Sequence, residues 1–398
     1  MVHGFFVFRK MIFITIITLI QFKSITAQKL CLNDHLAPSL FVMGPQKTGT
    51  TSLASDLKRV FDEIATGHPL LGDPSFFWKE KHYFGGDYVD YYGDLEHYLE
   101  HYPKCESESY QLSADCTPML SYPVAASRIQ DTYREQSGRL FFVATLRDPI
   151  ERLISEYHFM STHFIKSRRF LLWIDFDEYV ARHPESKSWS SWTIHFQTRD
   201  KHLNESLTSL EADRLFIPWL ESQLALASSC MKRDKILKSE LWPQCGKRGL
   251  FRSIYSSQLE YWWKHIPSYQ DQFAVFPMKY YFDHPNTVLR QLGQRLNLCS
   301  SSLQKRRKMS DIVLSPSPLL LLSSSCDRIF VSNVTHANAE SYQRQSYLRM
   351  LSDSLISDSL REFYKNFNKE LLKMVMYDHQ NNSDNVFWGD VTYYSFES

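Results

Sequence analysis

A stretch of small and hydroxyl-bearing residues near the start of the chain has the composition of a phosphate-binding loop. Its residues are Gly44, Pro45, Gln46, Lys47, Thr48, Gly49, Thr50, Thr51 and Ser52. Small residues let backbone amides approach a phosphate, and the N-terminus of a following helix adds positive potential. Lys47 supplies a full positive charge, and the threonine and serine hydroxyls add hydrogen-bond donors. We therefore expect the residues from Lys47 to Ser52 to bind a phosphate group.

The order of residues in this loop separates it from the Walker A motif. Walker A requires Gly-x-x-x-x-Gly-Lys-Ser/Thr, whereas Lys47 precedes Gly49 here. The alternative to a phosphate loop is an ordinary strand-to-helix turn in which the threonines cap the helix. A lysine and several donors within one turn favour phosphate binding.

Arg147 and Ser155 form a second candidate phosphate site. Arg147 follows the apolar run Leu140–Leu146, so it lies at the carboxyl end of an expected strand, where open α/β sheets bind ligands. Ser155 lies about two helical turns further on. Together they offer a second phosphate a charge-assisted fork and a hydroxyl. Of their neighbours, we expect Asp148 to cap the helix and Arg152 to form an ion pair on the helix surface.

These side chains need alternating strands and helices to position them, and the hydrophobic pattern predicts both. Short apolar runs that predict buried strands lie at Leu40–Met43, Leu140–Leu146 and Phe273–Phe276. Helical patterns cover Thr51–Phe61, Ser256–His265, Leu360–Met374 and a stretch that begins at Pro149. Strands separated by helices indicate a parallel sheet with crossover connections. The predicted fold class is therefore α/β, a three-layer, P-loop-like fold with a central parallel sheet flanked by helices.

The overall composition excludes several classes of protein. The chain has 398 residues, of which 45 are basic and 44 acidic, so the formal net charge is +1. With 43% apolar and 22% charged residues, it has the proportions of a globular protein and not of a disordered one. A near-neutral charge rules out nucleic-acid binding through bulk charge, although it permits a local basic groove. We expect no nucleic-acid partner.

The two candidate phosphate sites, and their order along the chain, resemble those of the sulfotransferases that use 3′-phosphoadenosine 5′-phosphosulfate (PAPS). The loop around Lys47 is similar to the family's 5′-phosphosulfate loop, and Arg147–Ser155 is similar to its 3′-phosphate motif. Lys79–Phe84 resembles the Lys-Glu-x-His-Phe-Phe stretch of the Golgi glycosaminoglycan branch. The other similar segments are Gly249–Trp262, Leu360–Asn368 and Phe387-Trp388. Within the family the chain looks closest to the N-acetylgalactosamine 4-sulfate 6-O-sulfotransferase and heparan sulfate sulfotransferase branch.

The resemblance implies transfer of a sulfuryl group from PAPS to a carbohydrate hydroxyl, for example in chondroitin or dermatan sulfate. Glu80 matches the family's catalytic base, and Lys47 would stabilise charge on the leaving phosphate oxygen. Arg147 and Ser155 would hold the 3′-phosphate. PAPS is then a co-substrate, and the reaction needs no metal.

Four residues are candidates for contact with an acidic polysaccharide acceptor: Lys79, His82, Asp115 and Arg248. Lys79 and His82 lie next to the expected base. Asp115 occupies the place of the family's substrate-loop residues, although turn formation explains it equally well. Arg248 adjoins a matched segment, although basic clusters are usually solvated faces.

The N-terminus has the features of a targeting segment for the secretory pathway. Arg9 and Lys10 precede the apolar run Met11–Ile20, and Ala27 is a small residue of the type found at cleavage sites. Residues 1–27 therefore predict a signal peptide or a short type II signal anchor. Both place the remaining chain in the lumen, and the resemblance indicates the Golgi. Three glycosylation sequons agree: Asn204, Asn333 and Asn381.

The chain has seven cysteines and no close Cys-x-x-Cys pair, which argues against a zinc site. In an oxidising lumen most cysteines should form disulfides. Sequence neighbours suggest the following pairs, with Cys31 left over: Cys105–Cys116, Cys230–Cys245 and Cys299–Cys326.

We expect a sulfotransferase domain over residues 38–390, with a weakly patterned insertion at about 161–246. The rival functions are a P-loop kinase that uses ATP, an inactive glycan-binding protein that retains the fold, and a sulfotransferase with a non-glycan acceptor. The position of Lys47 before Gly49 counts against the kinase. The sequence leaves the acceptor and the oligomeric state open.

Overall fold

The computed structural model describes residues 29–70, 79–85, 95–167, 216–221, 223–225, 227–228, 249–266, 269–298, 349, 351, 356–380, 389–394 and 396. The expected signal or anchor, Arg248, the three sequons and the pairs Cys230–Cys245 and Cys299–Cys326 lie outside these residues. Among the helices of the described part, none combines the length and apolar character that a membrane crossing needs.

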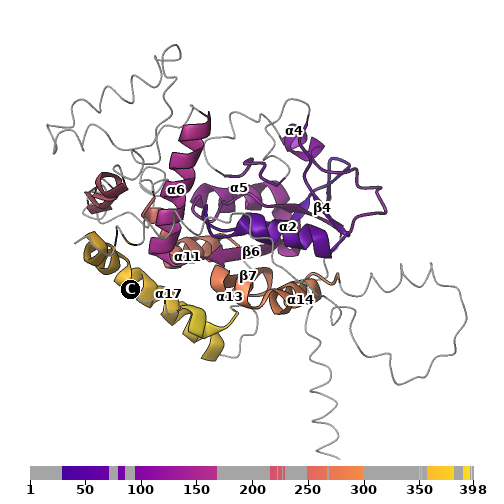
Figure 1. Ribbon diagram of the computed structural model, residues 1–398. Coiled ribbons are helices and arrows are strands. Elements are labelled where there is room, and N and C mark those ends of the chain that lie inside the picture. Colours follow the sequence, from indigo (N-terminus) through magenta and orange to yellow (C-terminus); the bar gives the residue numbers. More distant parts are fainter. Residues whose placement is uncertain are drawn as a thin grey trace, which may run out of the picture.

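Five parallel strands form the centre of the fold (Figure 1). From edge to edge they are β4 (Ile64–Thr66), β5 (Leu112–Asp115), β3 (Pro38–Met43), β6 (Phe141–Leu146) and β7 (Phe273–Pro277). Every neighbouring pair is parallel, with β3 between β5 and β6. The three strands predicted from apolar runs are confirmed, and β4 and β5 add two short strands beside them.

One face of the sheet is covered by three helices: α5 (Pro123–Tyr133), α11 (Tyr255–His265) and α17 (Ile356–Gln380). Aromatic rings from three adjacent strands stack beneath them. The ring of Phe142 lies 5.4 Å from that of Phe41 and 4.8 Å from that of Phe273. Trp262 of α11 meets Phe142 edge-on at 5.7 Å. This aromatic row fixes the helices on the sheet.

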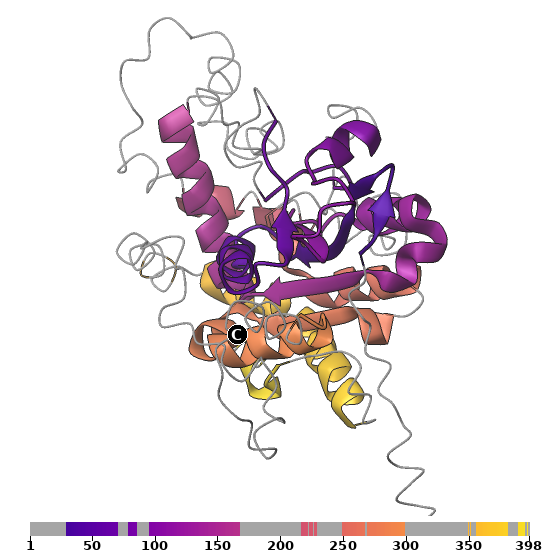
Figure 2. The ribbon, with the colours of Figure 1, turned by 90° about the vertical axis from the view of Figure 1, so that its right-hand side faces the viewer.

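The opposite face is covered by α2 (Thr50–Val60), α13 (Met278–Asp283) and α14 (Pro285–Arg295). Leu40 and Val42 point to this side because successive side chains of a strand alternate between faces. Helices thus lie on both sides of the sheet (Figure 2). The predicted three-layer α/β class is confirmed.

A third cluster lies around α6 (Pro149–Ser167), which starts at the predicted proline and continues to Ser167. Helical residues between 216 and 228 pack against it, and the rings of Phe216 and Trp219 lie 5.1 and 5.0 Å from that of Tyr157. Part of the stretch expected to be an insertion therefore belongs to the packed core.

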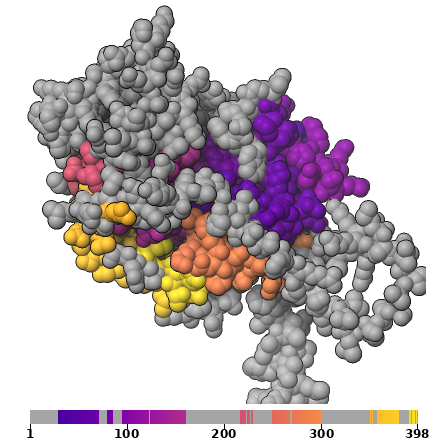
Figure 3. Space-filling view, viewed as in Figure 1, coloured from indigo at the N-terminus to yellow at the C-terminus, as the bar shows by residue number. Residues whose placement is uncertain are grey.

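The remaining elements are short. They are β1 (Cys31–Leu32), β2 (His35–Leu36), α4 (Leu95–Glu100), α12 (Tyr269–Gln272) and three 3₁₀ turns, η3 (Arg134–Arg139), η5 (Phe251–Ser253) and η8 (Val391–Tyr394). The last of these brings the C-terminal residues onto α13, where the rings of Tyr280 and Tyr393 lie 5.3 Å apart. Yellow and orange residues meet there on the face shown in Figure 3.

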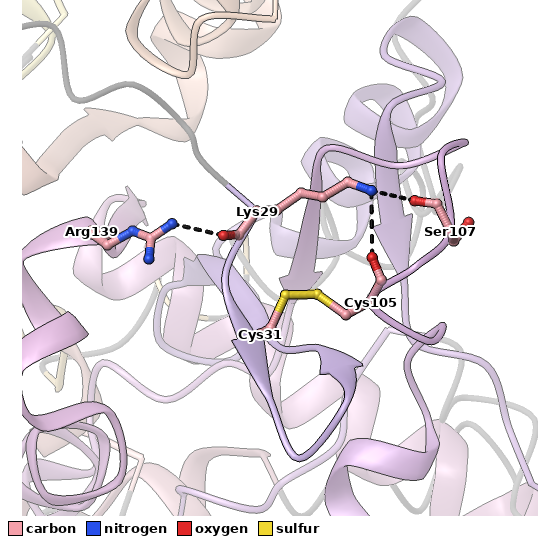
Figure 4. Close-up of a disulfide and its surroundings, with 5 residues drawn as sticks. All are labelled: Lys29, Cys31, Cys105, Ser107 and Arg139. Atoms are coloured by element: carbon pink, nitrogen blue, oxygen red, sulfur yellow. Dashed lines mark hydrogen bonds between the residues drawn. A yellow bond between two sulfur atoms is a disulfide. The ribbon is translucent and has the colours of Figure 1, made fainter.

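A disulfide joins Cys31 to Cys105, so the predicted pair Cys105–Cys116 is wrong (Figure 4). The β1–β2 hairpin lies against residues 103–105, where the N–H of Cys105 donates to the oxygen of Asp34 at 2.8 Å. Cys116 instead follows β5 into the core, where burial raises the pKa of its thiol to about 12. Closing a loop of 74 residues removes unfolded-state entropy worth about 4 kcal/mol in the chain-entropy description.

Candidate active site

The loop after β3 turns sharply into α2, and two of its positions require glycine. A Cβ atom on Gly44 would lie 2.7 Å from the backbone oxygen of Thr145, and one on Gly49 would lie 2.8 Å from the sulfur of Met278. Gly49 also has a φ of 90°, in the left-handed region that favours glycine. Lys47 has a φ of 76°, a conformation that costs a non-glycine residue about 1–3 kcal/mol. The surrounding structure therefore holds Lys47 in place.

The first turn of α2 presents backbone donors to this loop. The N–H of Leu53 bonds to the oxygen of Gly49 at 3.1 Å, so the preceding N–H groups, of Thr50, Thr51 and Ser52, have no acceptor within the helix. Among the described residues no side chain caps this end of α2. Free N–H groups and the helix dipole together favour an anion here.

The side chain of Thr48, unlike the N–H groups that follow it, forms hydrogen bonds within the protein. It is fully buried, and its hydroxyl donates to the oxygen of Pro45 at 2.7 Å and lies 3.1 Å from the hydroxyl of Thr145. Thr48 was expected to offer this hydroxyl to phosphate. The hydroxyl is instead used within the protein, where it shapes the loop.

The structure brings the two candidate phosphate sites together. Arg147 directly follows β6, is 9% exposed, and donates from Nη1 to the backbone oxygen of Lys47 at 3.4 Å. The backbone oxygen of Arg147 accepts from the hydroxyl of Tyr255 at 2.7 Å. Lys47 in turn places its Nζ 4.6 Å from the centre of the Phe159 ring, a cation–π distance. The loop, β6 and α6 thus meet at the carboxyl edge of the sheet.

Ser155 lies on the face of α6 that meets the loop. Arg152, Ser155 and Phe159 share this face, because residues three and four apart lie above one another on a helix. Arg152 contacts the backbone oxygen of Gln46 at 3.3 Å and Phe159 contacts Lys47, so Ser155 stands between two contacts with the loop. It is 4% exposed.

The predicted cap of α6 is confirmed. The N–H of Glu151 donates to a carboxylate oxygen of Asp148 at 2.8 Å, which satisfies a donor that the helix itself leaves without an acceptor.

The predicted ion pair of Arg152 is confirmed, but its predicted place on the helix surface is wrong, because this side chain is completely buried. It donates to the hydroxyl of Ser253, to the oxygen of Gly249 and, at 2.9 Å, to the carboxylate of Glu156. Residues about 100 positions later in the chain cover this side of α6. The spacing of charged residues within the helix could not show that other segments bury this face.

Glu156 is shared by two arginines. Arg252 donates to its second oxygen at 2.6 Å and to the side-chain oxygen of Gln46 at 3.0 Å. Burial opposes ionisation of Glu156, but Arg152 and Arg252 outweigh it and hold the pKa of this carboxyl below its usual value. Gln46 is therefore held at its backbone by one arginine and at its side chain by the other.

Glu80 lies in a turn between two basic neighbours. Its carboxylate contacts the ammonium of Lys79 and lies 3.2 Å from Nε2 of His82. The Glu80 side chain is 19% exposed, so it is held in place and remains accessible. Burial lowers the pKa of Lys79 to about 8 and that of His82 to about 4. At neutral pH His82 is therefore uncharged, and Lys79 is the cation beside Glu80.

The Glu80 turn and the phosphate loop share one electrostatic environment. The charge of Lys47 is close enough to Lys79 to contribute to lowering its pKa, after the larger effect of burial. The Glu80 turn is bonded through Lys79 to Cys116, directly after β5, and the phosphate loop follows the neighbouring strand β3, so a carboxylate, a lysine and a helix N-terminus lie at the same edge of the sheet. This combination suits transfer of a charged group from a phosphate to a hydroxyl.

Asp115 was expected to contact the acceptor, and the structure contradicts this. The side chain is completely buried, and its carboxylate accepts hydrogen bonds from Thr117 and, at 2.9 Å, from the hydroxyl of Tyr98. It offers no exposed surface to a polysaccharide.

Gln46, Arg252 and Thr117 are parts of the site that sequence reasoning did not single out. Gln46 is an uncharged member of the loop, and Arg252 and Thr117 depend on contacts with distant segments. Phe251, which precedes Arg252, points into the core. Within the described residues, no group of three or more His, Cys, Asp or Glu side chains gathers as a metal site would.

No family model matches the chain. Among curated proteins, the membrane-associated sulfotransferase kil1 of Dictyostelium discoideum is 25% identical over 285 residues, which are 66% of this chain and 56% of that protein. The match thus spans little more than half the length of this relative. Among solved structures, a sulfotransferase from Alicyclobacillus acidocaldarius matches with a TM-score of 0.37 and 16% identity, over 71% of this chain and 87% of that one. The curated match supports the sulfotransferase class and does not reach a particular branch of it.

Proposed function

We propose that the protein transfers the sulfuryl group of PAPS to a hydroxyl of a carbohydrate, such as chondroitin or dermatan sulfate. One observation carries the proposal, the contact between Arg147 and the backbone oxygen of Lys47. It joins two candidate phosphate sites that lie 100 residues apart in the chain. A nucleotide with phosphates on its 3′ and 5′ positions needs two such sites side by side.

In the proposed reaction, Glu80 removes the proton of the acceptor hydroxyl. The hydroxyl oxygen bonds to sulfur while the bond from sulfur to the 5′-phosphate oxygen breaks, and that oxygen keeps the electron pair. Lys47 and the N-terminus of α2 stabilise the charge that develops there, and Arg147 and Ser155 hold the 3′-phosphate. A positioned base accelerates such a step by about 10²–10⁴-fold.

The acceptor and the compartment are further parts of this proposal. The proposal of an acidic polysaccharide rests on the resemblance of Lys79–Phe84 to the glycosaminoglycan branch, because the Lys79 side chain itself is buried. A disulfide between Cys31 and Cys105 fits an oxidising compartment, and the Golgi lumen is the proposed location. The name of the curated relative describes that protein as membrane-associated. Here the proposed contact with the membrane is an anchor within residues 1–27.

The test is transfer of radiolabelled sulfate from PAPS by the full-length protein to a panel of sulfated and desulfated glycosaminoglycans. We expect one polymer to be labelled, and Lys47→Ala to abolish labelling. Lys58→Ala is the matched control, because Lys58 is an exposed residue in the last turn of the same helix. This control should label at the unsubstituted rate.

Three results would replace the proposal by a rival function. Failure to label any glycan, with adenosine 3′,5′-bisphosphate still raising the melting temperature, would indicate a non-glycan acceptor. Binding of glycan without any effect of the nucleotide would indicate an inactive glycan-binding protein. Metal-dependent transfer of labelled phosphate from ATP would indicate a kinase.

A further inference from the structure

One buried hydroxyl, that of Thr117, uses its full hydrogen-bonding capacity and joins Asp115 to the turn that carries Glu80. It donates to Asp115 at 2.6 Å and accepts from the backbone N–H groups of Lys81 at 2.9 Å and His82 at 3.1 Å. A hydroxyl has one donor and two acceptor positions, so each of them is occupied. Thr117 is 1% exposed, and water does not compete for these bonds.

Asp115 fixes the orientation of this hydroxyl. The oxygen that accepts from the Thr117 hydroxyl also accepts from the Thr117 N–H at 2.9 Å. The other oxygen accepts from the hydroxyl of Tyr98. With its proton directed at Asp115, the Thr117 hydroxyl turns its lone pairs toward Lys81 and His82.

A third bond attaches the beginning of the turn to the same segment. The N–H of Cys116 donates to the backbone oxygen of Lys79 at 2.9 Å. The backbone is thus held directly before Glu80 and at both residues that follow it. The turn needs this restraint, because His82 has a φ of 56°, a costly conformation for a non-glycine residue.

We propose that Thr117 is a positioning residue for Glu80, and that Asp115 acts through it. The inference rests on the proposed function, in which Glu80 is the base. The Thr117 hydroxyl keeps the Lys79–His82 turn in the one conformation that places the Glu80 carboxylate between its two basic neighbours. The phosphate loop has no part in these bonds, so binding of the donor nucleotide does not depend on them.

The test compares Thr117→Val, which removes the hydroxyl at nearly constant size, with Thr117→Ser, which retains it. We expect Thr117→Val to lower kcat by about 100-fold, the cost of a displacement of about 1 Å in an active site. Thr117→Ser should restore kcat, and the Kd of adenosine 3′,5′-bisphosphate should stay unchanged in both variants. A kcat that is unchanged in Thr117→Val, or lost equally in both variants, would overturn the proposal.

A second measurement separates this proposal from the proposed function. Hydrogen exchange in peptides that cover residues 79–85 reports on the amides of Lys81 and His82, whatever the acceptor. These amides should exchange faster in Thr117→Val and remain protected in Thr117→Ser. Equal protection in the two variants would disprove the positioning role even in a protein that transfers no sulfate. If Thr117→Val does not fold, Thr117→Ala, which deletes the hydroxyl without adding a methyl group, takes its place.

Discussion

The candidate site has two halves, the phosphate loop and the Lys79–His82 turn. They meet at one edge of the sheet, but different forces hold them. Full charges fix the phosphate loop, since Arg152 and Arg252 both reach it and share the buried carboxylate of Glu156. Neutral N–H groups fix the Lys79–His82 turn by meeting the hydroxyl of Thr117. A buried charge that loses its partner costs about 3–5 kcal/mol, whereas an ordinary hydrogen bond contributes about 1 kcal/mol.

This difference corresponds to what each half is proposed to do. The loop would bind a donor whose charge is large and constant, so fixed cations suit it. Glu80 would change its charge during each turnover, and a framework of neutral bonds tolerates that change. Loss of the buried charges that hold the loop should therefore appear mainly as lost stability, and loss of the hydroxyl that holds the turn should appear mainly as lost turnover.

The largest expected effect is on turnover, at Glu80. Glu80→Gln keeps the size of the side chain and removes the base, so kcat should fall by about 10²–10⁴-fold. Binding of adenosine 3′,5′-bisphosphate should remain as it was. The matched control is Glu96→Gln, at an exposed position of α4. Retention of the full rate by Glu80→Gln would remove Glu80 from the mechanism.

The next effect is on stability, at Glu156. Glu156→Leu leaves two buried guanidinium groups without their carboxylate and should lower the free energy of unfolding by about 3–5 kcal/mol, as measured by urea denaturation. Glu151 on the same helix is 36% exposed in its side chain and pairs with Arg147 at 3.4 Å. Glu151→Gln should therefore cost at most about 1 kcal/mol. Equal losses in the two variants would contradict the claim that buried full charges hold the loop.

The smallest of these effects is a pH dependence of the free energy of unfolding, which we expect from His82 in the Lys79–His82 turn. Its pKa is about 4 in the folded protein, against 6.5 for an ordinary histidine. The unfolded chain therefore binds the extra proton first, and stability should fall as the pH falls from 6.5 to 4, by about 3 kcal/mol at 1.4 kcal/mol per pKa unit. His82→Gln should remove this part of the decline in urea titrations between pH 4 and 7. An identical decline in both proteins would show that His82 is not the group responsible.

Strands and helices with strong local signals were predictable from the sequence. Leu40–Met43 and Leu140–Leu146 are continuous apolar runs, and both form buried strands. By contrast β4 has three residues, and β5 includes Ser113 and Asp115. Neither has the apolar run that marks a buried strand, so their place in the sheet comes from pairing with distant neighbours.

The site was predictable only where chemistry and local pattern coincide. Lys47 and Arg147 could be found because each follows a strand that the apolar pattern marks, and the structure places them in contact. Arg152 was misassigned because a pair of charges four residues apart looks the same on an exposed and on a covered helix face. Residues 249–253 cover this face of α6. They lie far from Arg152 in the sequence, so the spacing of charges within the helix could not predict the contact.

The contact between Gln46 and Arg252 has a consequence for synthesis of the protein. These residues are separated by 206 positions, and a ribosome that adds about 5–20 residues per second takes about 10–40 s to cover that distance. During this interval the nascent loop lacks the arginine that holds its glutamine side chain. The loop that carries Gln46 thus takes its final shape late in translation, when most of the sheet has already been made.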